Sequence, residues 1–520
     1  MEFPSTVPPA NPPGRRRPGA LLAAAALAAY AVLLLLFMDP YAGGSDTSGY
    51  LNHARLLYSG RVHIPFRALE GLPPEKAPYD VYTPLGLKPA PDGNGLVPTY
   101  PSGLPLLLAA AARAVGWVGA AALVAVAHAV IGILLVYALG RAFGLPRAWA
   151  ATGAVMVAAS PLYVLYSVQV MSDVPSLAWV AAALLAAWRA GDPDGPGAGP
   201  GWRWALASGA ALSVAVLIRP NSIIALAPIA AALGPRARRW PPLVLGGLPC
   251  AAFFCLHARA AYGSPLATGY GDSSYLFSAA WAPPTLAHFA LWLPVLFTPA
   301  VLAAAGLPWS RSGPVRARVV IAVWILVYLA FYSCYAPSHE TWWYLRFLLP
   351  AAPALVAGGL LVIHGAVGRR CGGTAFAAAL ALVLANGALL TRHLGVLNTR
   401  AHDRTYPAAM DWMGAHLPPN ALVAAWQTSG ALFYYTPFAF FRWENLDARS
   451  FGVITAAAQR AGRPVYAALF PKERGAALTV NMRGNWTQVG TAGIVTLWKW
   501  SPGPAAVRMI VGSTMAGGIR

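Results

Sequence analysis

The sequence predicts a multi-pass α-helical membrane protein that ends in a small α/β domain. Hydrophobic residues make up 58% of the 520 residues and charged residues 10%, whereas a soluble domain carries about 25% charged residues. Apolar runs of membrane-spanning length recur between Ala20 and His393, and each such run is a candidate transmembrane helix. After Asn398, charged and turn residues return and the apolar runs become short.

These changes in composition divide the chain into four expected parts. Residues 1–18 are rich in Pro and Arg, so they are expected to form a disordered cytoplasmic N-terminus. Residues 19–397 form the transmembrane domain, which includes a large first outer loop at 40–102. Residues 398–505 have the length of one ordinary domain, and residues 506–520 are expected to be a flexible tail.

About eleven apolar segments are expected to span the membrane as helices. They are Gly19–Met38, Val118–Gly140, Trp149–Val168, Val174–Ala190, Trp204–Ile218, Ile223–Leu233, Pro242–Ala261, Leu286–Leu307, Arg318–Tyr335, Tyr344–Val367 and Ala375–Leu394. Leu104–Ala114 is also apolar, but it is too short to cross a bilayer. We therefore expect it to form a half-inserted or re-entrant helix behind Pro101.

With this assignment, the arginine clusters between the spans all fall on one side of the membrane. Short loops rich in Lys and Arg are cytoplasmic by the positive-inside rule. The N-terminus is then inside, and the chain after Leu394 is outside the cytoplasmic (inner) membrane. The net charge of +20 does not indicate a nucleic-acid partner, because the arginines lie in short loops and not on one basic face.

The C-terminal part alternates expected helices with expected short strands. The helices are Ala408–Leu417 and Phe451–Ala461, and the strands are Leu422–Ala425, Phe438–Phe441, Val465–Leu469 and Ile494–Trp498. This alternation predicts a small α/β domain.

The stretch that follows the first span contains a carboxylate, Asp46, and then a helical pattern. Apolar residues recur there at three- and four-residue spacing, while Asn52, His53 and Arg55 fall on the other face, which is typical of a helix lying on a membrane surface. Two compatible interpretations of Asp46 stand. Asp46 is a helix N-cap, a catalytic carboxylate held at the membrane boundary, or both.

Other charged residues on the outer side allow a structural and a functional interpretation. Asp173 precedes a helix with Pro175 in its first turn, an ordinary N-cap arrangement, but it faces the same side as Asp46. Arg346 lies a few residues inside a span, where it either snorkels to the interface or faces a charged partner in a cavity. Arg219 and Arg259 lie in or next to outer turns.

The chain resembles the GT-C superfamily of integral-membrane glycosyltransferases, which includes protein O-mannosyltransferases and the aminoarabinose transferases that modify lipid A. The resemblance rests on the order and sidedness of four stretches: Asp46 with its helix up to Gly60, Tyr100–Ala109, Ser172–Pro175 and Tyr344–Pro350. It implies a sugar donor on a polyprenyl phosphate and an acceptor hydroxyl on a glycan, lipid or protein. Asp46 is the general base that the resemblance implies.

The same resemblance implies roles for further residues. Arg346, Arg219 and Arg259 are candidates for binding the donor phosphate, and Asp173 is a candidate second carboxylate. The expected cavity walls are Tyr50, Tyr100, His339, Glu340, Trp342 and Tyr344. Many members of the superfamily have two adjacent acidic residues where this chain has Asp46-Thr47, so neither a metal nor another cofactor is assigned.

Two alternatives remain from the residues themselves. A polytopic glycan polymerase or ligase outside this superfamily would use outer-loop arginines and would not need Asp46. A lipid-linked sugar transporter or flippase would need polar groups near the bilayer midplane, where His128 is the main candidate. A single histidine on an apolar helix is more often a packed or hydrogen-bonded residue.

The arginine distribution makes a prediction about topology. A reporter fused at Gly430 should report an outside location, and one fused at Gly372 an inside location, because an odd number of spans separates the N-terminus from the C-terminal domain. The reverse pattern would place Asp46 on the cytoplasmic side and contradict the assignment.

Overall fold

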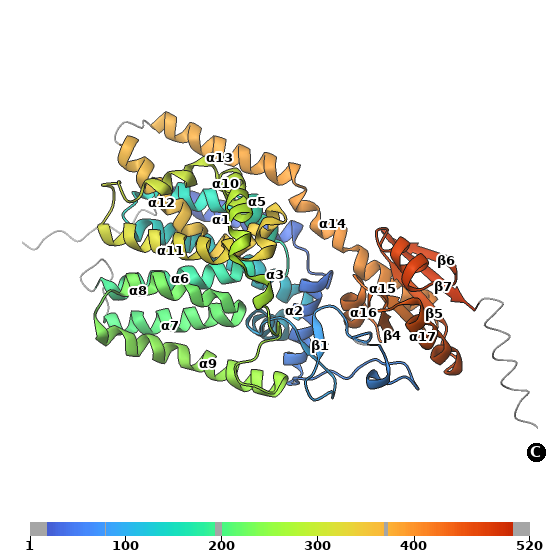
Figure 1. Cartoon of the computed structure of the whole chain (residues 1–520). Coiled ribbons are helices and arrows are strands. Elements are labelled where there is room, and N and C mark those ends of the chain that lie inside the picture. The colour runs from blue at the N-terminus through green and yellow to red at the C-terminus, as the bar shows by residue number, and fades with distance from the viewer. Residues whose placement is uncertain (1–17, 79, 193–199, 369–372, 503–520) are drawn as a thin grey trace, which may run out of the picture.

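The structure is a computed structural model that describes residues 18–78, 80–192, 200–368 and 373–502. A bundle of long helices makes up most of it, and a sheet with its own helices lies beyond one end of the bundle (Figure 1). The expected disordered N-terminus lies outside the described residues apart from Pro18, and the expected tail at 506–520 lies outside them entirely.

Nine helices of the described chain are long and apolar enough to cross a membrane. Two of them, α10 and α12, reach this length together with the 3₁₀ segments that precede them, Ala279–Trp281 and Trp342–Ala351. The helices are α1 (Pro18–Phe37), α3 (Gly103–Ala142), α6 (Asp173–Gly191), α7 (Gly201–Ile218), α9 (Trp240–Tyr262), α10 (Ala282–Phe297), α11 (Val315–Ser333), α12 (Ala352–Val367) and α13 (Gly373–His393).

The predicted number of eleven spans is corrected to nine or ten. The predicted span Trp149–Val168 consists of α4 (Arg147–Ala158) and α5 (Pro161–Ser167), which are bent by 64° and count as a tenth span if taken together. Proline has no N–H to continue the first helix, which explains the break. The predicted span Ile223–Leu233 contains α8 (Leu226–Leu233), whose 8 residues rise about 12 Å, too little for a hydrocarbon core about 30 Å thick.

The expected re-entrant helix Leu104–Ala114 forms the first part of α3. The chain leaves the helical conformation at Gly116, where φ is 69° and ψ is 175°, and then continues into the predicted span Val118–Gly140. A glycine tolerates positive φ without a steric cost, so the break falls at this residue. The segment is therefore helical, as expected, and a kink separates it from the following span.

The first outer loop contains α2 (Ser45–Tyr58) and the antiparallel strands β1 (Leu87–Pro89) and β2 (Leu96–Pro98). The expectation of a surface helix with one face in water is wrong for α2. All residues from Thr47 to Ala54 are buried, and they include Asn52 and His53 from the expected polar face. Burial and the neighbouring His257 lower the pKa of His53 to about 3, so its ring is neutral. Protein therefore covers both faces of α2 from Thr47 to Ala54.

The C-terminal part forms a mixed five-stranded sheet with strand order β4-β3-β5-β7-β6. Strand β3 is parallel to its two neighbours β4 and β5, whereas β7 is antiparallel to β5 and β6. The strands are β3 (Leu422–Ala425), β4 (Ala439–Arg442), β5 (Val465–Leu469), β6 (Asn485–Ala492) and β7 (Val495–Ser501); the helices are α14 (Thr399–Asp403), α15 (Thr405–His416), α16 (Ser429–Tyr435) and α17 (Ala448–Arg460).

Residues of the first outer loop complete the apolar cores on both faces of this sheet. On one face, Leu87 and Leu96 pack with α15, α16 and strand residues such as Val423. On the other face, Leu69 and Tyr82 pack with α17 and strand residues such as Leu422, Ala424 and Phe441. Side chains alternate between the faces of a strand, so β3 contributes to both cores. The first outer loop and the sheet therefore form one body at the same end of the bundle (Figure 1).

A pair of carboxylates joins the end of α1 to α14. Asp39 is 1% exposed, and its Oδ1 accepts a hydrogen bond of 3.1 Å from the backbone N–H of Tyr41. Burial and the nearby Asp403 carboxylate raise the pKa of Asp39 to about 9. Burial also raises the pKa of Asp403. The two carboxyl groups therefore retain a proton at neutral pH, and two ionised groups would repel each other.

This pair predicts a stability that falls as the pH rises. Folded Asp39 binds its proton more tightly than the unfolded chain does, so folding loses stability between the ordinary pKa of 3.8 and about 9. The amide side chain introduced by Asp39→Asn has no such proton to lose. The melting temperature of this variant should therefore exceed that of the wild-type protein by a margin that grows as the pH rises through that range. Intrinsic fluorescence of the detergent-solubilised protein measures this. The matched substitution of an exposed carboxylate, Asp411→Asn, should show no such gain; an equal gain would contradict the assignment.

Candidate active site at the outer end of the bundle

Asp46 lies in the first turn of α2, but it does not cap the helix. The N-cap position is Gly44, and no side chain caps the helix there. The Asp46 Oδ1 accepts a hydrogen bond of 2.6 Å from the Tyr100 hydroxyl, which also lies 2.8 Å from the Ser45 Oγ. The Tyr100 ring packs directly on α2 because Gly49 has no side chain there. The N-cap interpretation of Asp46 is therefore wrong. Its carboxylate is held instead by Tyr100, at the other end of the first outer loop.

The second oxygen of Asp46 forms an ion pair with Arg346. The Arg346 Nη1 donates to Asp46 Oδ2 at 3.0 Å, and the side chains are 17% and 29% exposed, respectively. Arg346 lies in the 3₁₀ segment Trp342–Ala351, next to the aromatic rings of Tyr344 and Phe347 at 5.6 and 5.3 Å. Its Nε is buried without a hydrogen-bond partner. The guanidinium therefore has donor capacity left for a ligand.

The charge of Arg346 keeps Asp46 ionised. Burial opposes ionisation of the carboxyl group, but the Arg346 guanidinium and the hydrogen bond from Tyr100 outweigh it, so the pKa of Asp46 lies below its ordinary value. Burial and the charge of Asp46 raise the pKa of the Tyr100 hydroxyl well above its ordinary value. At neutral pH the site thus contains an ionised carboxylate that can accept a proton, and a phenol that remains a donor.

A second ion pair lies beside the first. Arg219, at the end of α7, donates to the carboxylate of Asp173, at the start of α6. Burial opposes the charge of Arg219, but Asp173 outweighs it and raises the pKa of the guanidinium. The N-cap interpretation of Asp173 is also wrong, since no side chain caps α6. The guanidinium carbons of Arg219 and Arg346 each lie 5.3 Å from the centre of the Phe347 ring.

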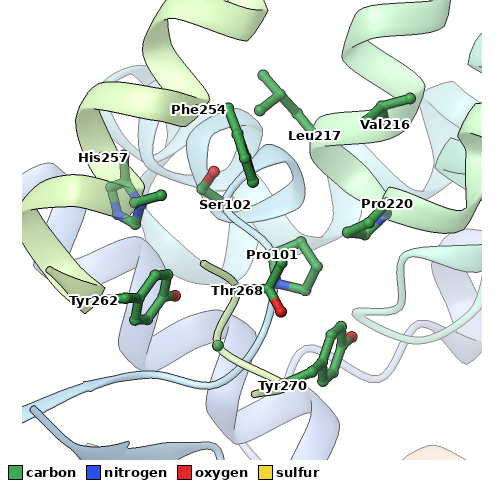
Figure 2. Close-up of a pocket in the computed structure, with 12 residues that line it drawn as sticks. Pro101, Ser102, Val216, Leu217, Pro220, Phe254, His257, Tyr262, Thr268 and Tyr270 are labelled. Carbon is green, nitrogen blue, oxygen red and sulfur yellow. The ribbon is translucent and has the colours of Figure 1, made fainter. Parts of the chain in front are cut away.

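A small pocket borders this site. Figure 2 shows Phe254, His257, Tyr262 and Pro220 around the segment that follows Tyr100. Its free volume is ≈ 20 Å³, which is room for about one water molecule. Tyr270, another lining residue, lies edge-on to Tyr100 with 6.1 Å between the ring centres. The rings of Tyr270 and Tyr100 therefore lie between the pocket and Asp46.

Not all predicted site residues meet at Asp46. Tyr50 does lie near it, because its ring is 5.0 Å from that of Tyr100 and its hydroxyl donates to Ser172 at 2.9 Å. His339 instead stacks on Trp281 at 5.3 Å, Trp342 packs against Trp292 and Trp343, and Glu340 is exposed. Arg259 is exposed on α9 between residues that line the pocket, so its side chain faces away from it.

The structure also identifies neighbours of the site that the sequence did not indicate. The ring centre of Tyr166 lies 5.7 Å from the guanidinium carbon of Arg346. The Tyr166 hydroxyl donates a hydrogen bond of 2.9 Å to the Trp343 carbonyl. Ser45, Phe347 and Tyr270 complete the set. Phe347 and Ser45 adjoin predicted residues in the sequence, but Tyr166 and Tyr270 come from other segments and carry no local signal.

His128 has the partners of a structural histidine. Its Nδ1 lies 2.7 Å from the Val124 carbonyl, and its Nε2 accepts a hydrogen bond of 3.1 Å from the Trp179 indole. Both ring nitrogens are therefore used within the helices. This arrangement leaves the transporter interpretation without its main polar candidate.

Metal ligands do not cluster in the part of the chain that the structure describes. No three side chains of His, Cys, Asp and Glu lie close enough together there to hold a metal ion. One oxygen of Asp46 and one oxygen of Asp173 are instead paired with guanidinium groups. The donor set at the site is suited to an anionic ligand.

Comparison with known proteins agrees with this fold. A family model described as Dolichyl-phosphate-mannose-protein mannosyltransferase matches residues 106–256, which is under half of the chain. A comparison with curated proteins gives no match. The crystal structure of ArnT from Cupriavidus metallidurans bound to undecaprenyl phosphate is similar, with a TM-score of 0.62 and 14% identity over 93% of this chain and 100% of that chain.

Two further solved structures have the same general architecture. ArnT from Cupriavidus metallidurans in the apo state has a TM-score of 0.61 and 14% identity over 94% of this chain and 100% of that chain. The arabinofuranosyltransferase AftD from Mycobacteria has a TM-score of 0.52 and 14% identity over 92% of this chain and 40% of AftD. The protein therefore has a GT-C-like membrane fold. The resemblance to the GT-C superfamily predicted from the motifs is confirmed.

The two ion pairs predict different stability losses. Asp173 is 1% exposed and Asp46 is 29% exposed, and removing one partner of a buried pair costs about 3–5 kcal/mol because the other charge is left unpaired. Asp173→Ala should therefore lower the unfolding free energy by about that amount, and Asp46→Ala by less. Denaturant unfolding in mixed micelles measures both.

A double substitution distinguishes lost pairing from lost packing. Replacing both partners, Asp173→Ala with Arg219→Met, leaves no buried charge and should recover most of the loss. Equal stability of the wild-type protein and Asp173→Ala would contradict the ion pair.

Proposed function

We propose that this protein transfers a sugar from a polyprenyl-phosphate donor to the hydroxyl group of an acceptor outside the membrane. The observation that carries the proposal is the partly exposed ion pair between Asp46 and Arg346, which puts a proton acceptor and a phosphate-binding group at the same point. The GT-C-like fold supports the reaction class. The ArnT structure with bound undecaprenyl phosphate supports a lipid phosphate as the donor carrier.

Asp46 acts as the general base in this proposal. The acceptor oxygen attacks the anomeric carbon, its proton moves to the Asp46 carboxylate, and the bond from that carbon to the phosphate oxygen breaks. A positioned general base contributes about 10²–10⁴-fold to such a reaction. The lowered pKa of Asp46 keeps the base ionised and ready. The hydrogen bond from Tyr100 holds one oxygen in place and leaves the other for exchange.

The leaving group is the polyprenyl phosphate, and its charge grows as the bond breaks. A sugar phosphodiester has one negative charge, while the phosphomonoester product approaches two. Cations placed at such a group stabilise the transition state. Arg346 and Arg219 are suited to this task, because a planar guanidinium matches phosphate oxygens and remains charged. Arg259 faces away from the pocket and is the weaker candidate.

Arg346 has a further role, because it cannot bind Asp46 and a phosphate equally well with the same N–H groups. In the donor-free site it keeps the carboxylate ionised but weakly basic. A donor phosphate offers an alternative partner, and a move of Arg346 toward it would raise the basicity of Asp46 when the acceptor arrives. Donor binding would in this way activate the base.

The surroundings of the site agree with a lipid-linked donor. The helices expose apolar residues to the bilayer, for example Leu22, Leu256 and Leu382, so a polyprenyl chain needs no special channel. The arginine distribution supports an N-terminus in the cytoplasm and a C-terminal domain outside the cytoplasmic membrane. The first outer loop and the sheet lie at the same end of the bundle (Figure 1), as this orientation requires.

The first test is removal of the base. Asp46→Asn keeps an oxygen for Tyr100 but has no basic carboxylate, so turnover should fall by about 10²–10⁴-fold while the protein stays folded and still binds undecaprenyl phosphate. Turnover would be measured with undecaprenyl phosphate carrying radiolabelled hexoses or pentoses. Near-normal turnover in a folded Asp46→Asn protein would exclude Asp46 as the base and leave Asp173 as the next candidate.

The second test separates phosphate binding from base catalysis. Arg346→Ala removes charge-assisted hydrogen bonds worth about 1.5–3 kcal/mol, so the Kd for undecaprenyl phosphate should rise by about 10–100-fold and turnover should fall with it. Arg259→Ala, on the exposed face of α9, should change neither. If Arg346→Ala bound undecaprenyl phosphate as tightly as the wild-type protein, Arg346 would not be a phosphate ligand.

A further inference from the structure

No side-chain cap at its own N-terminus holds α2 in place. Its N-cap, Gly44, has no side chain to satisfy the first backbone N–H groups, so neighbouring elements must hold the helix. Ser48, Asn52 and Arg55 are spaced by four and three residues, which places them on one face of α2. All three contact α16 of the C-terminal domain.

The closest of these contacts is at Gly430. A Cβ built on this glycine would collide with the Oγ of Ser48 and would lie 2.9 Å from the carbonyl oxygen of Leu85. The Nδ2 of Asn52 donates to the Gly430 carbonyl at 3.2 Å, and the Leu85 N–H donates to the Ser429 hydroxyl at 3.0 Å. The backbone of α16 therefore rests directly on α2, and a glycine is needed for this approach.

The other end of α16 is held by arginines of the first outer loop. The last carbonyls of a helix lack N–H partners within it and attract cations. Arg55 Nη1 donates to the Tyr434 carbonyl at 2.6 Å, with its guanidinium carbon 3.4 Å from the centre of the Tyr434 ring. Arg67 Nη2 donates to the Phe433 carbonyl at 2.9 Å. The two helices are thus joined at both ends of their contact.

The joined face lies next to Asp46 in the sequence. Asp46 precedes Ser48 by two residues in the first turn of α2, and Tyr50, in the next turn, bonds to Ser172 of the membrane part. A helix moves as a unit, so a displacement at Ser48 displaces Asp46 from Arg346 and Tyr100. We propose that α16 positions Asp46 for the transfer reaction by its contact with α2, an inference that rests on the proposed function. Gly430 is then a positioning residue.

Gly430→Ala tests this inference in the full-length protein. The added methyl group must push α2 away, so backbone amides of Ser45–Tyr58 should exchange hydrogen faster in the Gly430→Ala protein. A shift of about 1 Å can cost about 10²-fold in turnover, so kcat should fall by up to that factor. The Kd for undecaprenyl phosphate should change little, because Arg219 and Arg346 remain.

Two further variants make the result specific. Gly452 lies within α17 with no atom within 4 Å of its added Cβ, so Gly452→Ala should leave both exchange and turnover unchanged. Ser48→Gly combined with Gly430→Ala removes the collision with Ser48 and leaves the approach to Leu85, so it should restore much of the protection and turnover, measured relative to Ser48→Gly alone.

The outcomes separate this inference from the proposed function. Unchanged exchange in Gly430→Ala would overturn the positioning of α2 by α16, whatever the turnover. Faster exchange with normal turnover of the undecaprenyl-phosphate sugars would overturn the link from α16 to the reaction. If the wild-type protein transferred no hexose or pentose from undecaprenyl phosphate, the proposed function would fail, and the exchange measurement alone would decide whether α16 holds α2.

Discussion

The ion pair between Asp46 and Arg346 is the interaction on which the outer end of this protein depends. It joins residues 300 positions apart, one from the first outer loop and one from the last part of the helical bundle. Fully exposed ion pairs contribute little to stability, and fully buried ones need extensive compensation. With side chains 17% and 29% exposed, this pair lies between these limits. It is strong enough to order the site and open enough for a ligand to replace one partner.

A consequence is that α2 belongs to two bodies at once. Through Tyr50 it is tied to Ser172 at the start of membrane helix α6. Through Ser48, Asn52 and Arg55 it is tied to α16. The first outer loop also supplies apolar side chains to both cores of the C-terminal sheet. A sheet that shares its cores with a distant loop cannot be completed until that loop is in place, so the C-terminal domain and the outer loop depend on each other for folding.

The spans could be predicted from the sequence because the bilayer imposes a local requirement. Every backbone polar group in the hydrocarbon core must bond within its own helix, so long apolar runs identify the spans. Helix α8 is as apolar as a membrane span, and only its short length of 8 residues shows that it does not cross the bilayer. The break between Ala158 and Pro161 could also have been read from Ser160 and Pro161. Strand β6 was missed because most of its residues are exposed and it lacks the short apolar run that marks β3.

The site was only partly predictable, because its contacts are long-range. An Asp at the start of a helix is usually a cap, and nothing near Asp46 or Asp173 in the sequence reveals the arginines that pair with them. Tyr100 was expected as a wall, but its hydroxyl bonds directly to Asp46. His53 and Asn52 were expected on a wet face. The helix that covers Asn52 is 378 residues further along the chain, beyond the reach of any local pattern.

The charge balance of the site suits the proposed reaction at a membrane boundary. Two carboxylates and two guanidiniums sum to zero, so the donor-free site has no net charge to be stabilised near the bilayer. During transfer, Asp46 gains a proton while the phosphate gains one negative charge, so the net charge of the site with its donor does not change. Arg346 lies next to Asp46 and can follow the negative charge from the carboxylate to the phosphate. A site in which charge is only redistributed needs little help from solvent, and this property favours a partly exposed ion pair under a covering domain as the centre of the proposed transfer.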